Sequence, residues 1–190
     1  MIASGWRLRR GGLEDMDAVL ALERQVAEAP HWSRQSYAAI AGESVLAGAV
    51  RAGDLGAAVG REGSARRALF AVEEGGDLLG FAVGSVWGGE LSVSSVPGGR
   101  TPAWGELETV VVAAAGRRRG AGRALCLAVM DWCRDWGAER VELEVRAGSR
   151  GAVMLYEGLG FVETGRRRGY YTNPVEDALL MVSGLGDGAS

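Results

Sequence analysis

The residues in this chain that are best suited to chemistry begin with an arginine- and glycine-rich segment near its middle. The segment reads Arg117-Arg118-Arg119-Gly120-Ala121-Gly122, and it follows the apolar, β-branched run Val110-Val111-Val112. Glycines that follow a strand let backbone N–H groups face a ligand, and the start of a helix adds the positive end of its dipole. The arginines add formal positive charge beside those groups. The segment therefore predicts a binding site for a phosphate or a pyrophosphate.

Two common phosphate-binding motifs do not match this segment. A Walker P-loop is excluded, because it needs a Gly-Lys-Ser/Thr sequence and the chain contains no lysine. The dinucleotide-binding fingerprint fits poorly, because Gly116-x-x-x-Gly120-x-Gly122 has a different glycine spacing and lies in the middle of the chain. Taken alone, the arginine run fits a solvated turn before a helix equally well.

The elements that must position this segment can be predicted from the pattern around it. Apolar residues recur at spacings of three and four after the glycines, which predicts one face of a helix: Ala121, Ala124, Leu125, Ala128, Val129, Trp132 and Trp136. Gly137 suits the left-handed residue that ends a helix. Alternation over residues 140–146 predicts a strand, and a second helix, for which Ser149 is a good N-cap, is expected over 152–159, ended by Gly160. A hairpin is expected from residues 69–72 and 78–86, turned at 74–77, and Ser33 is placed to cap a short helix from Arg34.

The stretch from Glu106 to Phe161 resembles a known family. Arg117-x-x-Gly120-x-Gly122 after an apolar strand resembles the acyl-CoA pyrophosphate loop of the GNAT N-acetyltransferases. The downstream sequence LEVRAGSRGAVMLYEGLGF resembles one branch of that family, the ribosomal-protein-alanine N-acetyltransferases (RimI-type). Two further motifs agree with that branch, and the four together extend over most of the chain: Pro30-His31-Trp32-Ser33, and Arg167-Arg168-Gly169-Tyr170-Tyr171 followed by Glu176-Asp177-Ala178.

The resemblance implies a fold and a cofactor site. The expected fold is α/β, with a mixed, mainly antiparallel sheet of six or seven strands flanked by helices. Two central strands splay apart and open a slot for acetyl-CoA. The N–H groups of residues 118–123 would wrap the pyrophosphate, and the edge of the valine run would bind the pantetheine arm by strand addition, with the Val112 N–H polarising the thioester carbonyl. The implied cofactor-binding residues are Val110, Val111, Val112, Arg117, Arg118, Arg119, Gly120, Ala121, Gly122, Arg123 and Ser149.

The resemblance also implies two catalytic residues. Glu144 takes the place of the glutamate in the Leu-Glu-Val-Arg motif and would accept a proton from the amine, whose unperturbed pKa near 8 calls for only mild help. Tyr156 matches the tyrosine of Leu-Tyr-Glu and would protonate the departing thiolate. The residues alone leave alternatives open: Glu144 as a polar residue on a solvated strand face, with Glu142 or Glu106 as the base, and Tyr156 as a core residue.

The acceptor implied by the branch is the N-terminal α-amine of a protein, such as the alanine of a small-subunit ribosomal protein. Tyr170, Tyr171 and Trp32 would shape a groove for an extended peptide, although Trp32 and its neighbour Tyr37 fit core positions at least as well. The sequence departs from the family at two positions: Gly148-Ser149 stands where the family usually has Ser-Asn, and Gly169 replaces the asparagine expected before Tyr-Tyr. Alternative acceptors are a lysine side chain, an aminoglycoside or a polyamine. A non-catalytic acyl-CoA-binding module is a further alternative.

Composition bounds these hypotheses. At 47% hydrophobic residues, the chain is expected to form a single domain over residues 1–183, with insertions at about 42–67 and 88–102 and a disordered tail at 184–190. A net charge of −3 does not indicate nucleic acid as the main partner. No apolar stretch reaches the roughly 18 residues of a membrane span, and no signal-peptide pattern precedes the domain.

The cysteines and the histidine suggest no metal site. Cys126 and Cys133 lie two turns apart on one predicted helix, too far for a disulfide, which suits core residues of a reduced, cytoplasmic protein. One histidine and two such cysteines give no metal-ligand pattern. A monomer is the default expectation.

Overall fold

The computed structural model describes residues 5–26, 29–43, 50–51, 64–88 and 102–186. It has the expected α/β fold, with strands in the order β1-β3-β4-β5-β6-β8-β7 and the short β2 paired with β3. The strands are β1 Arg7–Arg10, β2 Val50–Arg51, β3 Ser64–Glu74, β4 Asp77–Trp87, β5 Ala103–Val112, β6 Ala138–Arg146, β7 Val162–Thr172 and β8 Val175–Gly184. The helices are α1 Met16–Glu23, α2 Arg34–Glu43, α3 Ala121–Asp135 and α4 Arg150–Glu157, with 3-10 turns at Leu13–Asp15 and Ala114–Gly116.

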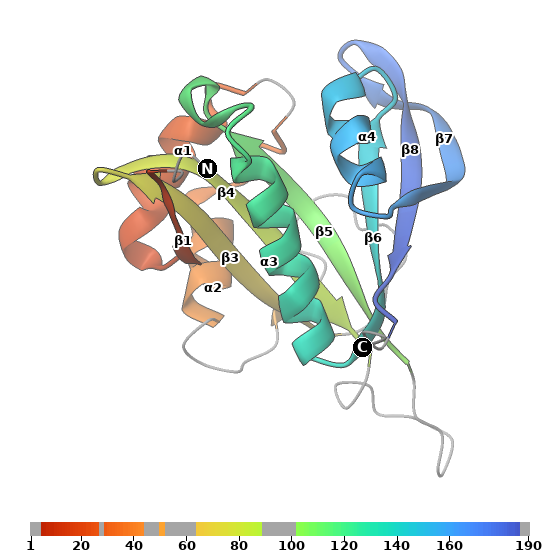
Figure 1. Ribbon diagram of the computed structural model, residues 1–190, viewed down its shortest axis with the longest axis horizontal. Coiled ribbons are helices and arrows are strands. Elements are labelled where there is room, and N and C mark those ends of the chain that lie inside the picture. Colours follow the sequence, from red (N-terminus) through yellow and green to blue (C-terminus); the bar gives the residue numbers. More distant parts are fainter. Residues whose placement is uncertain (1–4, 27–28, 44–49, 52–63, 89–101, 187–190) are drawn as a thin grey trace.

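Helices cover both faces of the sheet. Figure 1 shows α3 in front of β3, β4 and β5, with α1 and α2 behind them and α4 in front of β6. Two hydrophobic clusters fill the space between these layers. The first joins α3 and α4 to one face of the sheet, and the second joins α1 and α2 to the other face. Within the described part of the chain, no helix is long and apolar enough to cross a membrane.

The two central strands separate, as the resemblance implies. β5 and β6 are parallel and are paired at Ala103↔Ala138, Gly105↔Val141 and Glu106↔Glu142, where their register ends. The later residues of β6 pair with β8 instead, from Arg140↔Gly184 to Arg146↔Ala178. In Figure 1 the two strands meet near the lower end of the view and diverge upward. The second half of β5 therefore has a paired edge toward β4 and a splayed edge toward β6.

A β-bulge in β5 changes which side chains face each layer. Val83 of β4 is opposite Thr109, but Gly84 is opposite Leu107, so Glu108 is the extra residue. Leu107 belongs to the cluster under α3, whereas Val111 belongs to the cluster under α1 and α2. A bulge shifts the inward and outward alternation by one residue. The valine run consequently enters the splayed region with Val110 and Val112 on the α3 side.

Helix α3 packs closely on the sheet, because glycines lie beneath it. A Cβ atom at Gly84 would collide with Val129, and one at Gly105 would lie 2.5 Å from the Cys133 Sγ atom. The predicted apolar face is buried at Ala121, Leu125 and Val129, but Trp136 is 47% exposed. Trp136 is exposed because the helix ends at Asp135 and the chain turns away at the next residue. The predicted left-handed glycine is present, with a φ of +77° at Gly137.

Other expected elements are confirmed with longer boundaries. The predicted hairpin is β3 and β4, turned at residues 74–77, and Ser33 caps α2, since its Oγ atom accepts the Ser36 N–H at 3.1 Å. The expected insertion at 42–67 includes the end of α2, β2 and the start of β3, and its other residues lie outside the described ranges. Of the expected insertion at 88–102, residues 89–101 lie outside them. Leu185, within the expected tail, is 4% exposed, and its N–H donates to the Glu139 carbonyl.

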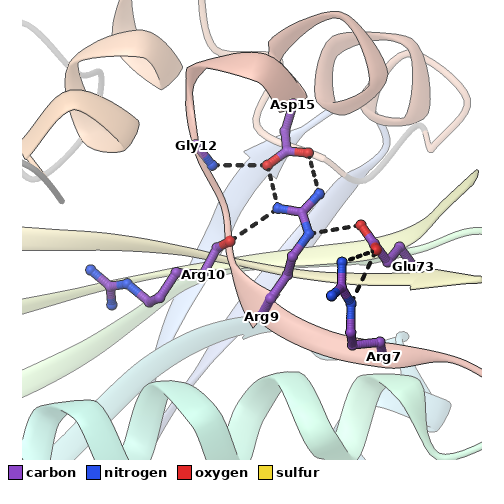
Figure 2. Close-up of polar contacts among 6 residues, drawn as sticks. All are labelled: Arg7, Arg9, Arg10, Gly12, Asp15 and Glu73. Atoms are coloured by element: carbon purple, nitrogen blue, oxygen red, sulfur yellow. Dashed lines mark hydrogen bonds and ion pairs between the residues drawn. The ribbon is translucent and has the colours of Figure 1, made fainter. Parts of the chain in front are cut away.

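Strand β1 is fastened at the sheet edge by a cluster of ionic hydrogen bonds, drawn in Figure 2. The Arg9 guanidinium donates to both Asp15 oxygens, at 2.6 and 2.8 Å, and to Glu73 at 2.7 Å. Arg7 donates to the same Glu73 carboxylate at 2.6 Å. The hydrogen bond from Arg9 lowers the pKa of Asp15, with help from the Gly12 N–H. The cluster ties β1 to both β3 and the start of α1.

Tyr37 is a core residue of the α1–α2 layer. Its ring is fully buried and meets Phe81 edge-on, with 5.6 Å between ring centroids. Its hydroxyl donates to the Glu23 carboxylate at 2.6 Å. Trp32 is half-buried beside it, with a ring-centroid distance of 5.4 Å, and its backbone N–H donates to the same carboxylate. The core alternative is therefore right for Tyr37.

Candidate active site

The glycine-rich segment forms the loop that begins α3, as the sequence predicts. We refer to residues 117–123 as the phosphate loop. Its backbone is left-handed at two positions, with φ values of +59° at Arg118 and +83° at Gly120. Gly120 is the N-cap of α3, and no side chain caps this end of the helix. The N–H groups of the first turn have no intrahelical acceptor, because helix geometry supplies none there. The loop has the geometry and dipole of an anion site.

The arginines of the phosphate loop have different surroundings. Arg117 donates from Nε to the Val112 carbonyl at 3.2 Å, which places its guanidinium at the end of β5. Arg119 forms an ion pair with Glu74, at 2.5 Å. Arg118 and Arg123 are exposed. The positive charge expected at the loop is thus present at Arg117, Arg118 and Arg123, while that of Arg119 is balanced by a carboxylate.

Three elements meet beside the first turn of α3. A Cβ atom at Gly122 would lie 3.4 Å from a Leu155 methyl group of α4 and 3.6 Å from a Val112 methyl group of β5. The phosphate loop, the splayed end of β5 and helix α4 therefore come together at this point. Val110 and Val112 are half-buried there, while the Val111 side chain is buried in the opposite layer. Val112 is therefore close to the phosphate loop, as the prediction of a shared cofactor site requires.

Glu144 lies with both predicted acceptor tyrosines. Its carboxylate, 25% exposed, forms an ion pair with the Arg167 guanidinium at 3.0 Å. The hydroxyl of Tyr170 interacts with Glu144 and with Arg167, and Glu144 acts electrostatically on Tyr171 as well. The two tyrosine rings meet edge-on, with 5.2 Å between centroids. Long-range pairing brings them together, because β8 lies between β6 and β7 in the sheet.

Arg146 is a residue of this region that the sequence analysis did not single out. Its guanidinium lies over the Tyr171 ring, 3.9 Å from the ring centroid, and bonds Glu176 at 3.3 Å. Glu176 also accepts the N–H of Gly148, at the start of the segment that leads into α4. Arg146 therefore links β6 to the β7–β8 hairpin and to α4. Its place as the last residue of Leu-Glu-Val-Arg was the signal that could have identified it.

Tyr156 is buried on α4 between the two halves of the site. It is 9% exposed and packs edge-on against Phe161, with 5.9 Å between ring centroids. Burial raises the pKa of Tyr156, and the neighbouring Cys126 and Tyr171 raise it further. Burial also raises the pKa of Cys126 to about 12, so its thiol stays protonated at neutral pH. Both cysteines are free and buried, as expected for core residues.

The remaining predicted residues are less closely joined to this cluster. Ser149 is the N-cap of α4, but its side chain makes no capping hydrogen bond, unlike the expectation. Gly169 has a φ of +59°, and its N–H donates to Asp177 at 2.9 Å. Asparagine tolerates that conformation better than most residues, so glycine can replace it there. The ring and hydrogen-bond contacts of Trp32 are with the α1–α2 layer, not with Tyr170 or Tyr171.

The alternative carboxylates lie at the splay point. Glu106 and Glu142 face each other at the last paired position of β5 and β6, and Glu142 bonds Arg140 at 2.8 Å. Glu108, which the sequence analysis did not consider, pairs with Arg67 at 2.9 Å, and both side chains are 7% exposed. Burial raises the pKa of Glu108, and Arg67 opposes that shift. Among the described residues, no group of three or more His, Cys, Asp or Glu side chains could hold a metal ion.

Comparison with known proteins agrees with this geometry. The family model described as "Acetyltransferase (GNAT) family" matches residues 26–161. A ribosomal protein bS18-alanine N-acetyltransferase from Escherichia coli is 45% identical over 67 residues, which are 34% of this chain and 45% of that protein. Less than half of that relative's length is therefore matched. An N-alpha-acetyltransferase from Sulfurisphaera tokodaii is 34% identical over 119 residues, which are 62% of this chain and 70% of that protein.

The solved structures agree on the fold. The crystal structure of a ribosomal-protein-alanine N-acetyltransferase from Escherichia coli superimposes with a TM-score of 0.68, over 97% of each chain and at 24% sequence identity. The likeness at this identity concerns the path of the backbone.

The four tyrosines of the chain give a pH prediction. Burial is the largest cause of a raised pKa at Tyr37, Tyr156, Tyr170 and Tyr171 alike. Absorbance titration of the folded protein should therefore show tyrosinate appearing above the ordinary pKa near 10. In urea the same titration should return to about 10. Because the pKa values of these tyrosines are higher in the folded state than in the unfolded state, the free energy of unfolding keeps its full value below about pH 10. It falls as the pH rises further, since ionisation of the tyrosines then favours the unfolded state. A tyrosine that ionises at or below pH 10 in the folded protein would contradict the described burial.

Proposed function

Because the chain belongs to the GNAT acetyltransferase family, we propose that it transfers the acetyl group of acetyl-CoA to the N-terminal α-amine of a protein. The observation that carries the proposal is the grouping of Glu144 with Tyr170 and Tyr171, with Glu144 two residues beyond the last β5–β6 pair. Relatives named as N-terminal acetyltransferases of ribosomal and other proteins support this choice of acceptor. In the proposal, an extended N-terminal peptide lies against Tyr170 and Tyr171 and presents its amine to Glu144.

The residues of the phosphate loop suit the binding of acetyl-CoA. The first-turn N–H groups of α3 and the exposed Arg118 and Arg123 would hold the pyrophosphate. The splayed edge of β5 would hold the amide-containing arm in the manner of an added strand, with the Val112 N–H directed to the thioester carbonyl. The closeness of Gly122 to Val112 supports this arrangement, because it brings the phosphate loop beside the end of β5. When bound, acetyl-CoA supplies an acetyl group activated as a thioester.

The chain's own residues would then handle two protons. As the N–C bond forms and the C–S bond breaks, Glu144 accepts the proton that leaves the amine nitrogen. Tyr156 donates its hydroxyl proton to the departing sulfur, and solvent restores both groups afterwards. The raised pKa of Tyr156 keeps this donor protonated throughout the neutral range. A neutral α-amine is already well populated near its pKa of about 8, so proton acceptance by Glu144 is most valuable below that pH.

A panel of acceptors tests the proposal directly. Release of free CoA would be followed with acetyl-CoA and short peptides that carry different free N-termini, with an acetylated peptide as the blank. A polyamine, an aminoglycoside and a peptide with only a lysine amine would represent the alternatives. We expect turnover on alanine- or serine-starting peptides. Turnover confined to the small amines or to lysine would overturn the choice of acceptor, and CoA binding without turnover on any amine would favour a binding module.

Substitution of the two proposed catalytic residues tests the chemistry. Glu144→Gln should lower kcat about 100-fold at pH 7, as expected for loss of a general base, and the deficit should shrink as the pH rises past about 8. Tyr156→Phe should lower kcat by a similar factor of roughly 10 to 100 at all these pH values. Glu163→Gln, in the exposed pair with Arg166 on β7, is the matched control and should be neutral. If Glu142→Gln instead carries the pH-dependent loss, Glu144 is not the base.

Two matched glycine substitutions test the cofactor site. Gly120 and Gly137 both have left-handed backbones at opposite ends of α3, with φ values of +83° and +77°. An added Cβ atom meets only a Trp6 carbon at 4.0 Å in the first case and nothing within 4 Å in the second. Alanine at either position should destabilise the fold by about 1–2 kcal/mol, through backbone strain. Calorimetry should show about tenfold weaker CoA binding for Gly120→Ala alone. Equal CoA affinities in the two variants would contradict the site.

A further inference from the structure

We propose that the Arg119 guanidinium is a positioning group that holds the phosphate loop in its binding conformation through Glu74, and that it is not itself a phosphate ligand. This inference rests on the proposed binding of acetyl-CoA at the phosphate loop. It separates Arg119 from its neighbours in the arginine run, which sequence alone treats as equivalent. It also assigns a role in cofactor binding to Glu74, a carboxylate in the turn between β3 and β4.

The contacts of Arg119 direct its side chain toward that turn. Nη1 donates to Glu74 Oε2 at 2.8 Å, and Nη2 donates to Glu74 Oε1 at 2.5 Å, so the pair is bidentate. Nη1 also donates to the Ala115 carbonyl at 3.3 Å. The hydrogen bond from Arg119 lowers the pKa of Glu74, so the carboxylate is charged at neutral pH. These contacts engage three of the five N–H donors of the guanidinium, and the pairing cancels a negative charge at Glu74 that would otherwise repel a phosphate.

A second contact holds the backbone of the same residue. The Trp6 indole N–H donates to the Arg119 carbonyl at 3.2 Å. Trp6 immediately precedes β1, which the Arg9, Asp15 and Glu73 cluster of Figure 2 fastens to the sheet. Two consecutive carboxylates at the end of β3, Glu73 and Glu74, therefore hold different segments in place. Glu73 secures the strand that carries Trp6, and Glu74 secures the side chain of Arg119.

The contacts of Arg119 with Glu74 and Trp6 matter for binding because of where Arg119 lies in the phosphate loop. Arg119 lies between the two left-handed residues Arg118 and Gly120, with φ values of +59° and +83°. A left-handed backbone is unfavourable at a residue other than glycine and persists only where its surroundings hold it. The ties to Glu74 and Trp6 act on the residue between the two. They fix the orientation of the adjoining N–H groups before a ligand arrives, which lowers the entropy that binding must overcome.

The test compares Glu74→Gln, Arg119→Gln, the double neutral variant and the charge swap Glu74→Arg with Arg119→Glu. Calorimetric Kd for CoA, KM for acetyl-CoA, kcat and unfolding temperature would be measured for each folded protein. We expect each single variant to raise Kd and KM by about two- to fivefold, a range typical of an exposed ion pair, with kcat at saturation unchanged. The double variant should be no weaker than either single one, because both remove the same interaction. The charge swap should recover part of the lost affinity.

The opposite role for Arg119 gives a different pattern. If its guanidinium binds phosphate directly, Glu74→Gln frees the guanidinium and leaves Kd unchanged or lower, while the charge swap becomes the weakest binder. Either result would overturn the inference. Arg134→Gln, which removes the exposed pair with Asp131 near the other end of α3, is the matched control and should leave Kd unchanged. Failure of the unmodified protein to bind CoA would refute the proposed function itself, and this inference with it.

Discussion

The end of β5–β6 pairing at Glu106 and Glu142 is the constraint on which the rest of the site depends. Buried backbone N–H and C=O groups need hydrogen-bond partners, and beyond this point each of the two strands keeps a partner on one edge alone. β6 remains paired with β8 up to Arg146, and β5 remains paired with β4. Among the residues that the structure describes, the edges of β5 and β6 that face each other have no strand pairing with one another there. In the proposed function an extended, amide-containing ligand supplies the missing partners at the edge of β5.

The two halves of the site are held by separate sets of interactions. The phosphate loop is tied to the N-terminal edge of the sheet, through Glu74 and Trp6. The acceptor half depends on β6, β7 and β8, where Glu144 bonds Arg167 and Arg146 bonds Glu176. Helix α4 lies between them, since Leu155 approaches the start of α3 and Tyr156 acts electrostatically with Tyr171. In the proposed function these halves hold the cofactor and the acceptor, and α4 contacts both.

Local features of this protein were predictable from sequence, and long-range contacts were not. The left-handed Gly137 and the capping residue Ser33 follow from short-range rules, and both are confirmed. Periodicity identified the buried face of α3 but extended it to Trp136, because periodicity does not show where a helix stops. The bulge at Glu108 was not predicted for a similar reason. A bulge is defined by the register with the neighbouring strand, and the sequence of β5 alone does not give that register. The ion pair of Glu108 with Arg67 joins positions 41 residues apart, and no pattern in an arginine-rich chain selects that partner.

The resemblance selects candidate catalytic residues, and the structure shows what surrounds them. Glu144 and Tyr156 were selected by motif alone, and their environments differ in a way that suits opposite tasks. Glu144 is partly exposed and next to a cation, so it can exchange a proton with solvent after accepting one. Tyr156 is buried next to a protonated thiol, and burial raises its pKa, so it stays protonated at neutral pH. An ordinary thiol has a pKa near 8.5, below that of the buried phenol, so transfer of this proton to the departing sulfur has to accompany cleavage of the C–S bond. Carboxyl and phenol groups already differ in ordinary pKa, near 4.3 and 10, and the burial of Tyr156 widens that difference between the proposed base and the proposed acid.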